Sequence, residues 1–185
     1  DFGSEGGAVE MDETYYGVAP DADLTKHQNW AQKNKIVSLI DRDTGAARSI
    51  VVGSVDRPTV ARIMRENISR NAHLITDEAQ VYRSPGVFLA SKHSTVNHSK
   101  DGWVARANPE VHTQTIEGFF SIFKRGMKGV YQHCGSQHLH RYVAEFDFRY
   151  SNRVKLGVDD FTRTERAISG IVGKRLTYRR INAAS

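Results

Sequence analysis

Residues 9–16 read VEMDETYY and alternate as a half-buried strand does, with Asp12 on the opposite face from Val9 and Met11. The acidic positions of this strand lie among apolar ones, so one face is built for a core and the other for polar contacts. Downstream, the β-rich runs 35–40 and 48–55 are separated by a turn-forming cluster and predict a hairpin.

The next elements alternate between helix and strand. Asp56 followed by Pro58 is typical of a helix start, and the short apolar run 73–76 predicts a buried strand after that helix. We expect a short helix at 78–82 and an extended segment at 94–98. A sheet of this kind combines an antiparallel meander with a parallel strand reached through a helical crossover.

Two amphipathic helices are predicted in the second half, at 113–128 and 139–150. The first is the most regular segment of the chain, because apolar side chains recur at i, i+3, i+4 and i+7, namely Ile116, Phe119, Phe120 and Phe123. The order of elements therefore predicts an α/β fold with a mixed central sheet flanked by helices.

Length and composition limit the function classes. The 185 residues are 39% hydrophobic, which suffices for one core, and no apolar run is long enough to span a membrane. Cys134 is the single cysteine, so these residues hold no internal disulfide framework and no cysteine-based zinc ribbon. We expect a cytoplasmic protein, and the start at Asp1 suggests a fragment of a longer chain.

Charge is distributed unevenly along the chain, whose net charge is +5. The first 23 residues hold seven acids and no base, whereas residues 118–155 hold seven Lys and Arg against two acids. A basic surface favours a polyanion, and acids inside such a protein are explained if they hold divalent cations next to phosphate.

Three acids lie where an open sheet would gather a site: Asp12 in the first strand, Asp77 at the end of a later strand, and Glu117 on the long helix. Carboxylate oxygens are ligands that Mg²⁺ prefers. The spacing alone also fits a strand-face acid, a helix N-cap and a solvated helix residue. Neighbouring acids are alternative ligands: Glu10, Glu13 and Glu78.

Several separate words around these acids, in this order, resemble one family. They are 9–15 (VEMDETY), 76–78 (TDE), 96–99 (VNHS), 112–126 (HTQTIEGFFSIFKRG) and 138–150 (HLHRYVAEFDFRY). Together they resemble the DDE-type transposases of bacterial insertion sequences, in the Merlin-related, ISXO-type branch, over roughly residues 8–155.

The resemblance implies a ribonuclease H-like fold with Asp12, Asp77 and Glu117 as the metal-binding triad, holding two Mg²⁺ ions for which Mn²⁺ can substitute. Lys124 matches the lysine that this branch carries after its third acid, and two helical turns place it on the face of Glu117. We expect residues 1–155 to form the catalytic domain and 156–185 a basic helical extension of it.

The implied activity is metal-dependent cleavage of DNA strands and transfer of the freed 3′ end, with double-stranded transposon ends and target DNA as partners. We expect no membrane partner, association with the nucleoid, and a homodimer or larger assembly on DNA. Relatives often carry an N-terminal zinc ribbon or helix-turn-helix, which these residues lack. The residues expected to contact DNA are Lys124, Arg125, Lys128, Arg141, Arg149, Arg153, His98 and His112.

Two other functions remain open at this point. The chain can be another nuclease of the same fold, such as a junction resolvase or an RNA-strand hydrolase. It can also be a non-catalytic DNA-binding module derived from a transposase. For His98 and His112, a structural hydrogen-bonding role is the alternative to DNA contact.

Overall fold

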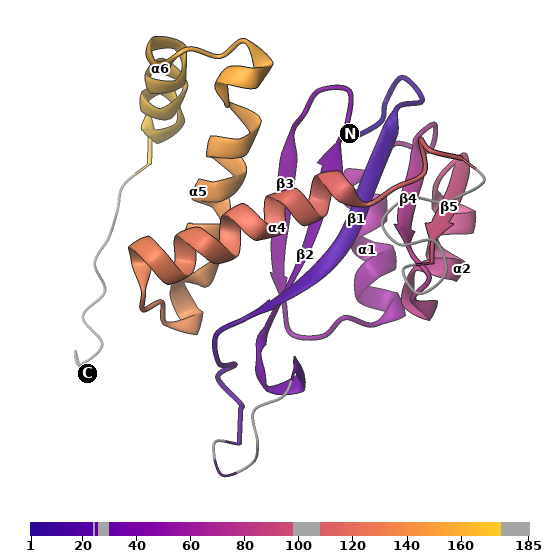
Figure 1. The fold of residues 1–185 in the computed structure, drawn as a ribbon, viewed down its shortest axis with the longest axis horizontal. Helices are drawn as coiled ribbons and strands as arrows, with labels where there is room; N and C mark the ends of the chain where they lie inside the picture. The colour runs from indigo at the N-terminus through magenta and orange to yellow at the C-terminus, as the bar shows by residue number, and fades with distance from the viewer. Residues whose placement is uncertain (24, 26–29, 98–107, 175–185) are drawn as a thin grey trace. The chain divides into compact units, whose positions relative to one another are not determined.

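A mixed sheet with β1 at its centre organises the fold (Figure 1). The computed structural model describes residues 1–23, 25, 30–97 and 108–174, and within these five strands lie in the order β3-β2-β1-β4-β5. β1 runs antiparallel to β2, which runs antiparallel to β3, while β4 and β5 are parallel to β1 and to each other. The predicted meander with parallel addition is thus confirmed. The strands are β1 Ala8–Tyr16, β2 Asn34–Asp41, β3 Ala47–Val52, β4 His73–Asp77 and β5 Lys92–Val96.

Helices cover both faces of this sheet. On one face, Val9 and Met11 pack in a core with α1 and with Tyr82 of α2. On the other face, Ile36 and Ile40 of β2 pack against the apolar stripes of α4 and α5, and Figure 1 shows α4 crossing in front of the strands. The helices are α1 Arg57–Asn67, α2 Gln80–Leu89, α4 Gln114–Gly126 and α5 Leu139–Ser151.

The helix α1 starts as predicted, whereas α2 is longer than predicted. The Asp56 side chain accepts a hydrogen bond from the Thr59 amide at 2.9 Å, which caps α1 as expected. The helix predicted at 78–82 is too short, because α2 continues through Pro85 to Leu89 with Tyr82 and Pro85 buried. Burial of this helix against the sheet outweighs the breaking tendency of the proline.

Short helical turns complete the order. A π-helical turn, Met127–Tyr131, extends α4, and 3₁₀ turns occupy Trp30–Gln32, Ser136–His138 and Val154–Leu156. No helix among the described residues is long and apolar enough to cross a membrane.

The chain divides into two compact units, Asp1–Ser151 and Asn152–Ser185. The second unit contains α6, Asp160–Ile171, whose first turn is capped by Asp159 accepting from the Thr162 amide at 2.7 Å. Arg163 donates to the Asn152 carbonyl oxygen at 2.8 Å and fixes the connection that leads into this helix. The sheet and the predicted triad lie in the first unit.

The contact of α4 with α5 requires a glycine. A methyl group on Gly126 would stand 2.4 Å from Cζ of Phe146, the ring that packs edge-on against Phe123. We therefore expect Gly126→Ala to lower the free energy of unfolding by about 1–3 kcal/mol, the usual cost of overpacking.

Gly118 of the same helix is the matched control, since a methyl group there meets nothing within 4 Å. Gly118→Ala should raise the free energy of unfolding by about 0.5–1 kcal/mol through helix propensity. Urea unfolding followed by circular dichroism measures both. Equal effects of the two substitutions would contradict the packing described here.

Candidate active site

Two of the three predicted acids lie on neighbouring strands. β1 and β4 pair in parallel from Ala8 opposite His73 to Glu10 opposite Ile75, and Asp12 and Asp77 each lie two residues beyond this last pair. Alternation points both side chains to the sheet face that α4 covers, because Val9 and Leu74 belong to the core on the other face. The two side chains therefore leave the same sheet face from neighbouring strands.

Glu117 lies in the first turn of α4. One of its carboxylate oxygens accepts a hydrogen bond from the hydroxyl of Thr113 at 2.9 Å, and Thr113 is completely buried. The helix N-terminus also favours a negative charge at this position. Glu117 is thus held in the first turn of α4 by a buried residue, and is not a fully solvated helix residue.

The charges of the three acids interact. The pKa of Asp12 is raised well above its usual range, first by burial and then by the negative charges of Glu13, Asp77 and Glu117, while a hydrogen bond from the Glu13 amide opposes this rise. A pKa raised by like charges means that the acids lie within electrostatic range of one another. The surroundings of Asp12 therefore carry an excess of negative charge.

Glu13 lies on the opposite sheet face, as the alternation predicts. Its carboxylate accepts a hydrogen bond from the hydroxyl of Tyr82, a buried residue of α2. Burial raises the pKa of Glu13, and burial together with the charges of Glu13 and Asp12 raises the pKa of Tyr15 to about 12. The charge of Glu13 therefore acts on Asp12 from the opposite face of the sheet.

The donor set fits small, hard divalent cations. All three predicted ligands offer carboxylate oxygens, and a cation among them would offset the negative charges that, after burial, raise the pKa of Asp12. Within residues 1–23, 25, 30–97 and 108–174, no three acidic, His or Cys side chains stand close enough to share one ion. Two of the predicted ligands accept hydrogen bonds within the protein: Glu117 from the hydroxyl of Thr113, and Asp77 from the Ala79 amide at 2.9 Å.

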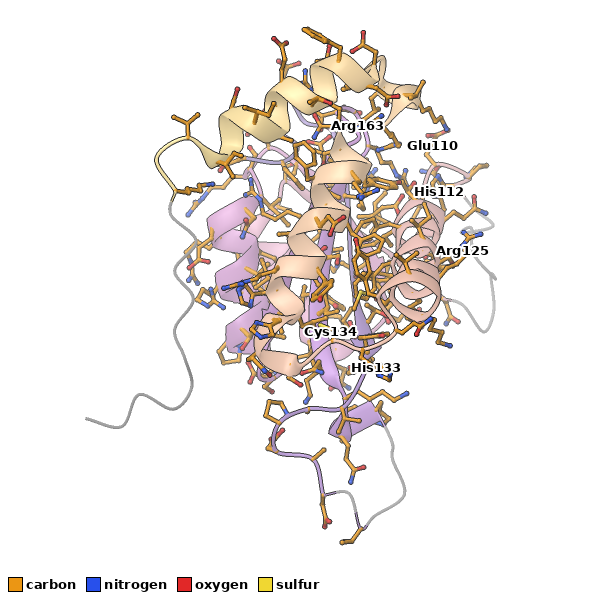
Figure 2. The ribbon with its side chains drawn as sticks, turned by 90° about the vertical axis from the view of Figure 1, so that its left-hand side faces the viewer. Glu110, His112, Arg125, His133, Cys134 and Arg163 are labelled. Carbon is orange, nitrogen blue, oxygen red and sulfur yellow. The ribbon has the colours of Figure 1, made fainter. Side chains whose placement is uncertain are left out.

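The predicted basic residues of α4 are exposed. Lys124 lies two turns beyond Glu117, and Arg125 and Lys128 lie at the far end of the helix and in the π-helical turn. Figure 2 shows His112 at the start of α4 and Arg125 farther along it. The helix α4 thus carries Glu117 in its first turn and exposed cations toward its C-terminus.

The remaining predicted DNA contacts have different environments. Arg141 of α5 is exposed, whereas Arg149 forms an ion pair with Glu145 at 2.8 Å on the same helix. Arg153 belongs to the second unit, and His98 lies outside the described residues.

His112 takes part in an internal contact that the sequence did not reveal. Its Nδ1 lies 2.9 Å from Nη2 of Arg42, and burial together with the Arg42 charge lowers the pKa of His112. A neutral ring accepts at Nδ1 from the arginine, so its proton is on Nε2. Arg42 also pairs with Glu10 at 2.6 Å, which accounts for an acid considered above as an alternative ligand.

The mutual influence of the acids can be measured without metal. We expect Asp77→Asn and Glu117→Gln each to lower the pKa of Asp12, because each removes a negative neighbour, while burial keeps that pKa above its usual value. Carbon-13 NMR titration of the aspartate carboxyls reports the change.

Glu78→Gln serves as the control for this titration. Glu78 is exposed, accepts a hydrogen bond from Asn97 at 2.6 Å, and is not among the groups that raise the pKa of Asp12. An Asp12 titration that is unchanged in both Asp77→Asn and Glu117→Gln would show that the acids do not converge.

The fold of this chain is similar to the folds of known integrase catalytic cores. The catalytic core domain of BIV integrase matches with a TM-score of 0.52 at 14% identity, over 78% of this chain and 82% of that one. The HTLV-2 integrase catalytic core domain in complex with magnesium matches with TM-scores of 0.50 and 0.52 in its trimeric and dimeric forms. These forms are 14% and 15% identical, and the matches cover 78% of this chain and 84% and 85% of those chains. At this identity the similarity establishes the fold, which is ribonuclease H-like.

Sequence comparison gives the family. Among curated protein sequences none matches this chain. The model of the ISXO2-like transposase domain matches residues 5–151, which include all of β1, β4, α4 and α5. This chain therefore belongs to the ISXO2-like transposase domain family.

Proposed function

We propose that this chain is the catalytic core of a DNA transposase, with Asp12, Asp77 and Glu117 as the ligands of two divalent cations. The observation that carries the proposal is that Asp12 and Asp77 lie on the paired strands β1 and β4, and Glu117 in the first turn of α4, within a domain of the ISXO2-like transposase family. Three acids of distant sequence position concentrate negative charge at one place on an otherwise basic chain.

The proposed reaction is hydrolysis of a DNA strand at the transposon end, followed by attack of the freed 3′-hydroxyl on target DNA. Two Mg²⁺ or Mn²⁺ ions held by these carboxylates would supply activation of the attacking oxygen and stabilisation of the leaving one. Asp12 and Asp77 would hold the ions from two neighbouring strands, and Glu117 from the first turn of α4. Lys124, two turns along α4, is suited to a phosphate of the bound strand.

DNA is the proposed partner because the exposed side of α4 and the start of α5 carry cations. Lys124, Arg125, Lys128 and Arg141 are exposed, and long basic side chains at such positions contact phosphates. Joining two transposon ends requires two active sites, so we propose a dimer or larger assembly on DNA. The HTLV-2 integrase core, by its description, forms dimers and trimers.

Two competing functions make different products. A resolvase or an RNA-strand hydrolase of the same fold would cut its substrate without joining a 3′ end to a new strand. Matched DNA and RNA–DNA hybrid duplexes separate these activities. A non-catalytic module would bind DNA and release no heat on titration with Mn²⁺.

Asp77→Asn tests the triad directly. We expect nicking and joining of end-containing DNA in Mg²⁺ to fall by roughly 10²–10³-fold, the order lost when one preorganised electrostatic group is removed. Gel assays with a labelled strand follow both steps. Glu78→Gln, one residue away and exposed, should retain parental rates. A parental rate in Asp77→Asn would remove this residue from the site.

The basic surface makes a separate prediction about salt. DNA affinity should fall with salt at a log-log slope of about −0.9 per phosphate neutralised, and Arg125→Ala and Lys128→Ala should each reduce that slope by about 1. Fluorescence anisotropy at several salt concentrations measures it. The matched control is Arg62→Ala, since Arg62 is an exposed cation of α1 that pairs with Glu66 at 2.9 Å. An affinity independent of salt would contradict DNA binding by this surface.

A further inference from the structure

A fully buried carboxylate lies two residues before Asp12 on the same face of β1. Glu10 has no exposed surface, and its Oε1 is 2.6 Å from Nε of Arg42. Its Oε2 accepts the backbone amide of Ile116 at 2.8 Å. A buried charge is tolerated when it is paired and hydrogen-bonded, and both oxygens of Glu10 meet that condition.

Arg42 extends this contact to the segment that leads into α4. Its Nη1 donates to the backbone carbonyl oxygen of Glu110 at 2.6 Å, and its Nη2 donates to the carbonyl oxygen of His112 at 2.6 Å. The Arg42 side chain is 15% exposed. The planar guanidinium suits such a fork, because its donors point in fixed directions within one plane. Figure 2 shows Glu110 and His112 together next to the start of α4.

The amide that Glu10 binds belongs to the first turn of α4. Thr113 is the N-cap residue but makes no side-chain cap bond, and Ile116, three residues later, has one of the amides that a helix leaves unsatisfied. Glu10 therefore caps α4 from the sheet. Glu117 follows Ile116 directly, so the cap joins the strand of Asp12 to the turn of Glu117.

We infer that Glu10 and Arg42 are positioning residues that set the third acid of the site against the first. The inference rests on the proposed function, since it concerns the same acids. Both oxygens of Glu10 and all three guanidinium nitrogens of Arg42 have partners inside the protein, so the pair acts through the position of Glu117.

The test measures Mn²⁺ binding to the folded protein through the electron paramagnetic resonance signal of the free ion. Arg42→Lys keeps the charge that pairs with Glu10 but loses the fork to the two carbonyl oxygens. We expect it to weaken Mn²⁺ affinity by about 10–100-fold, as loss of a group that orients a ligand does. Arg62→Lys, in the exposed ion pair of α1, should leave the affinity unchanged.

A double-mutant cycle separates positioning from general destabilisation. In a Glu117→Gln background, Arg42→Lys should cause no further loss of Mn²⁺ affinity, because the ligand through which it acts is already removed. If Arg42→Lys does not fold, as judged by urea unfolding, His112→Ala removes only the contact to Nδ1 and should weaken Mn²⁺ binding in the same direction.

Each outcome decides a different claim. An unchanged Mn²⁺ affinity in the folded Arg42→Lys protein, or in His112→Ala when it replaces that variant, would overturn the inference. An equal loss in both backgrounds would also overturn it. If Glu117→Gln alone leaves Mn²⁺ affinity unchanged, the proposed triad fails.

Discussion

A buried ion pair between β1 and the hairpin turn holds the helix of the third acid against the strand of the first. Glu10 caps α4 from the sheet, and Arg42 binds the carbonyl oxygens that precede the helix. Without this contact the amide of Ile116 in the first turn of α4 would lose its partner, at a cost comparable to a lost hydrogen bond. This set of contacts among Glu10, Arg42 and His112, the clamp, therefore allows α4 to begin next to the predicted acids of the site.

The opposed charges of the chain have one explanation in this arrangement. The acids lie near the N-terminus of α4, where burial and like charges raise the pKa of Asp12. Exposed cations lie toward the C-terminus of the same helix. Repulsion among carboxylates is unfavourable for folding, and a protein retains it where bound cations offset it. Membership of the ISXO2-like transposase domain family is consistent with that interpretation.

Most of the fold could be predicted because periodicity reports which side is buried. The alternation of 9–16 correctly separated the face of Asp12 from the face of Glu13, and the apolar stripe of residues 116–123 correctly predicted the helix that covers the sheet. The extent of α2 was missed because local signals around Pro85 favour a helix end, and only burial against the sheet overrides them.

The clamp was beyond prediction for a different reason. Arg42 lies in a turn-forming cluster and meets partners 32 to 70 residues away, so no local pattern marks it. From the sequence, Glu10 fits a metal ligand as well as an ion-pair partner, and His112 fits a DNA contact as well as an internal one, because their partners lie far away in the chain. Charged side chains in a sequence indicate that pairing is required, but three-dimensional proximity decides which pairs form.

The measurement that tests the central claim most directly is anomalous diffraction from crystals soaked in Mn²⁺. The account predicts manganese peaks about 2.0–2.2 Å from carboxylate oxygens of Asp12, Asp77 and Glu117, the usual distance for small divalent ions. Peaks bound only by other residues, with these three carboxylates uncoordinated, would contradict it.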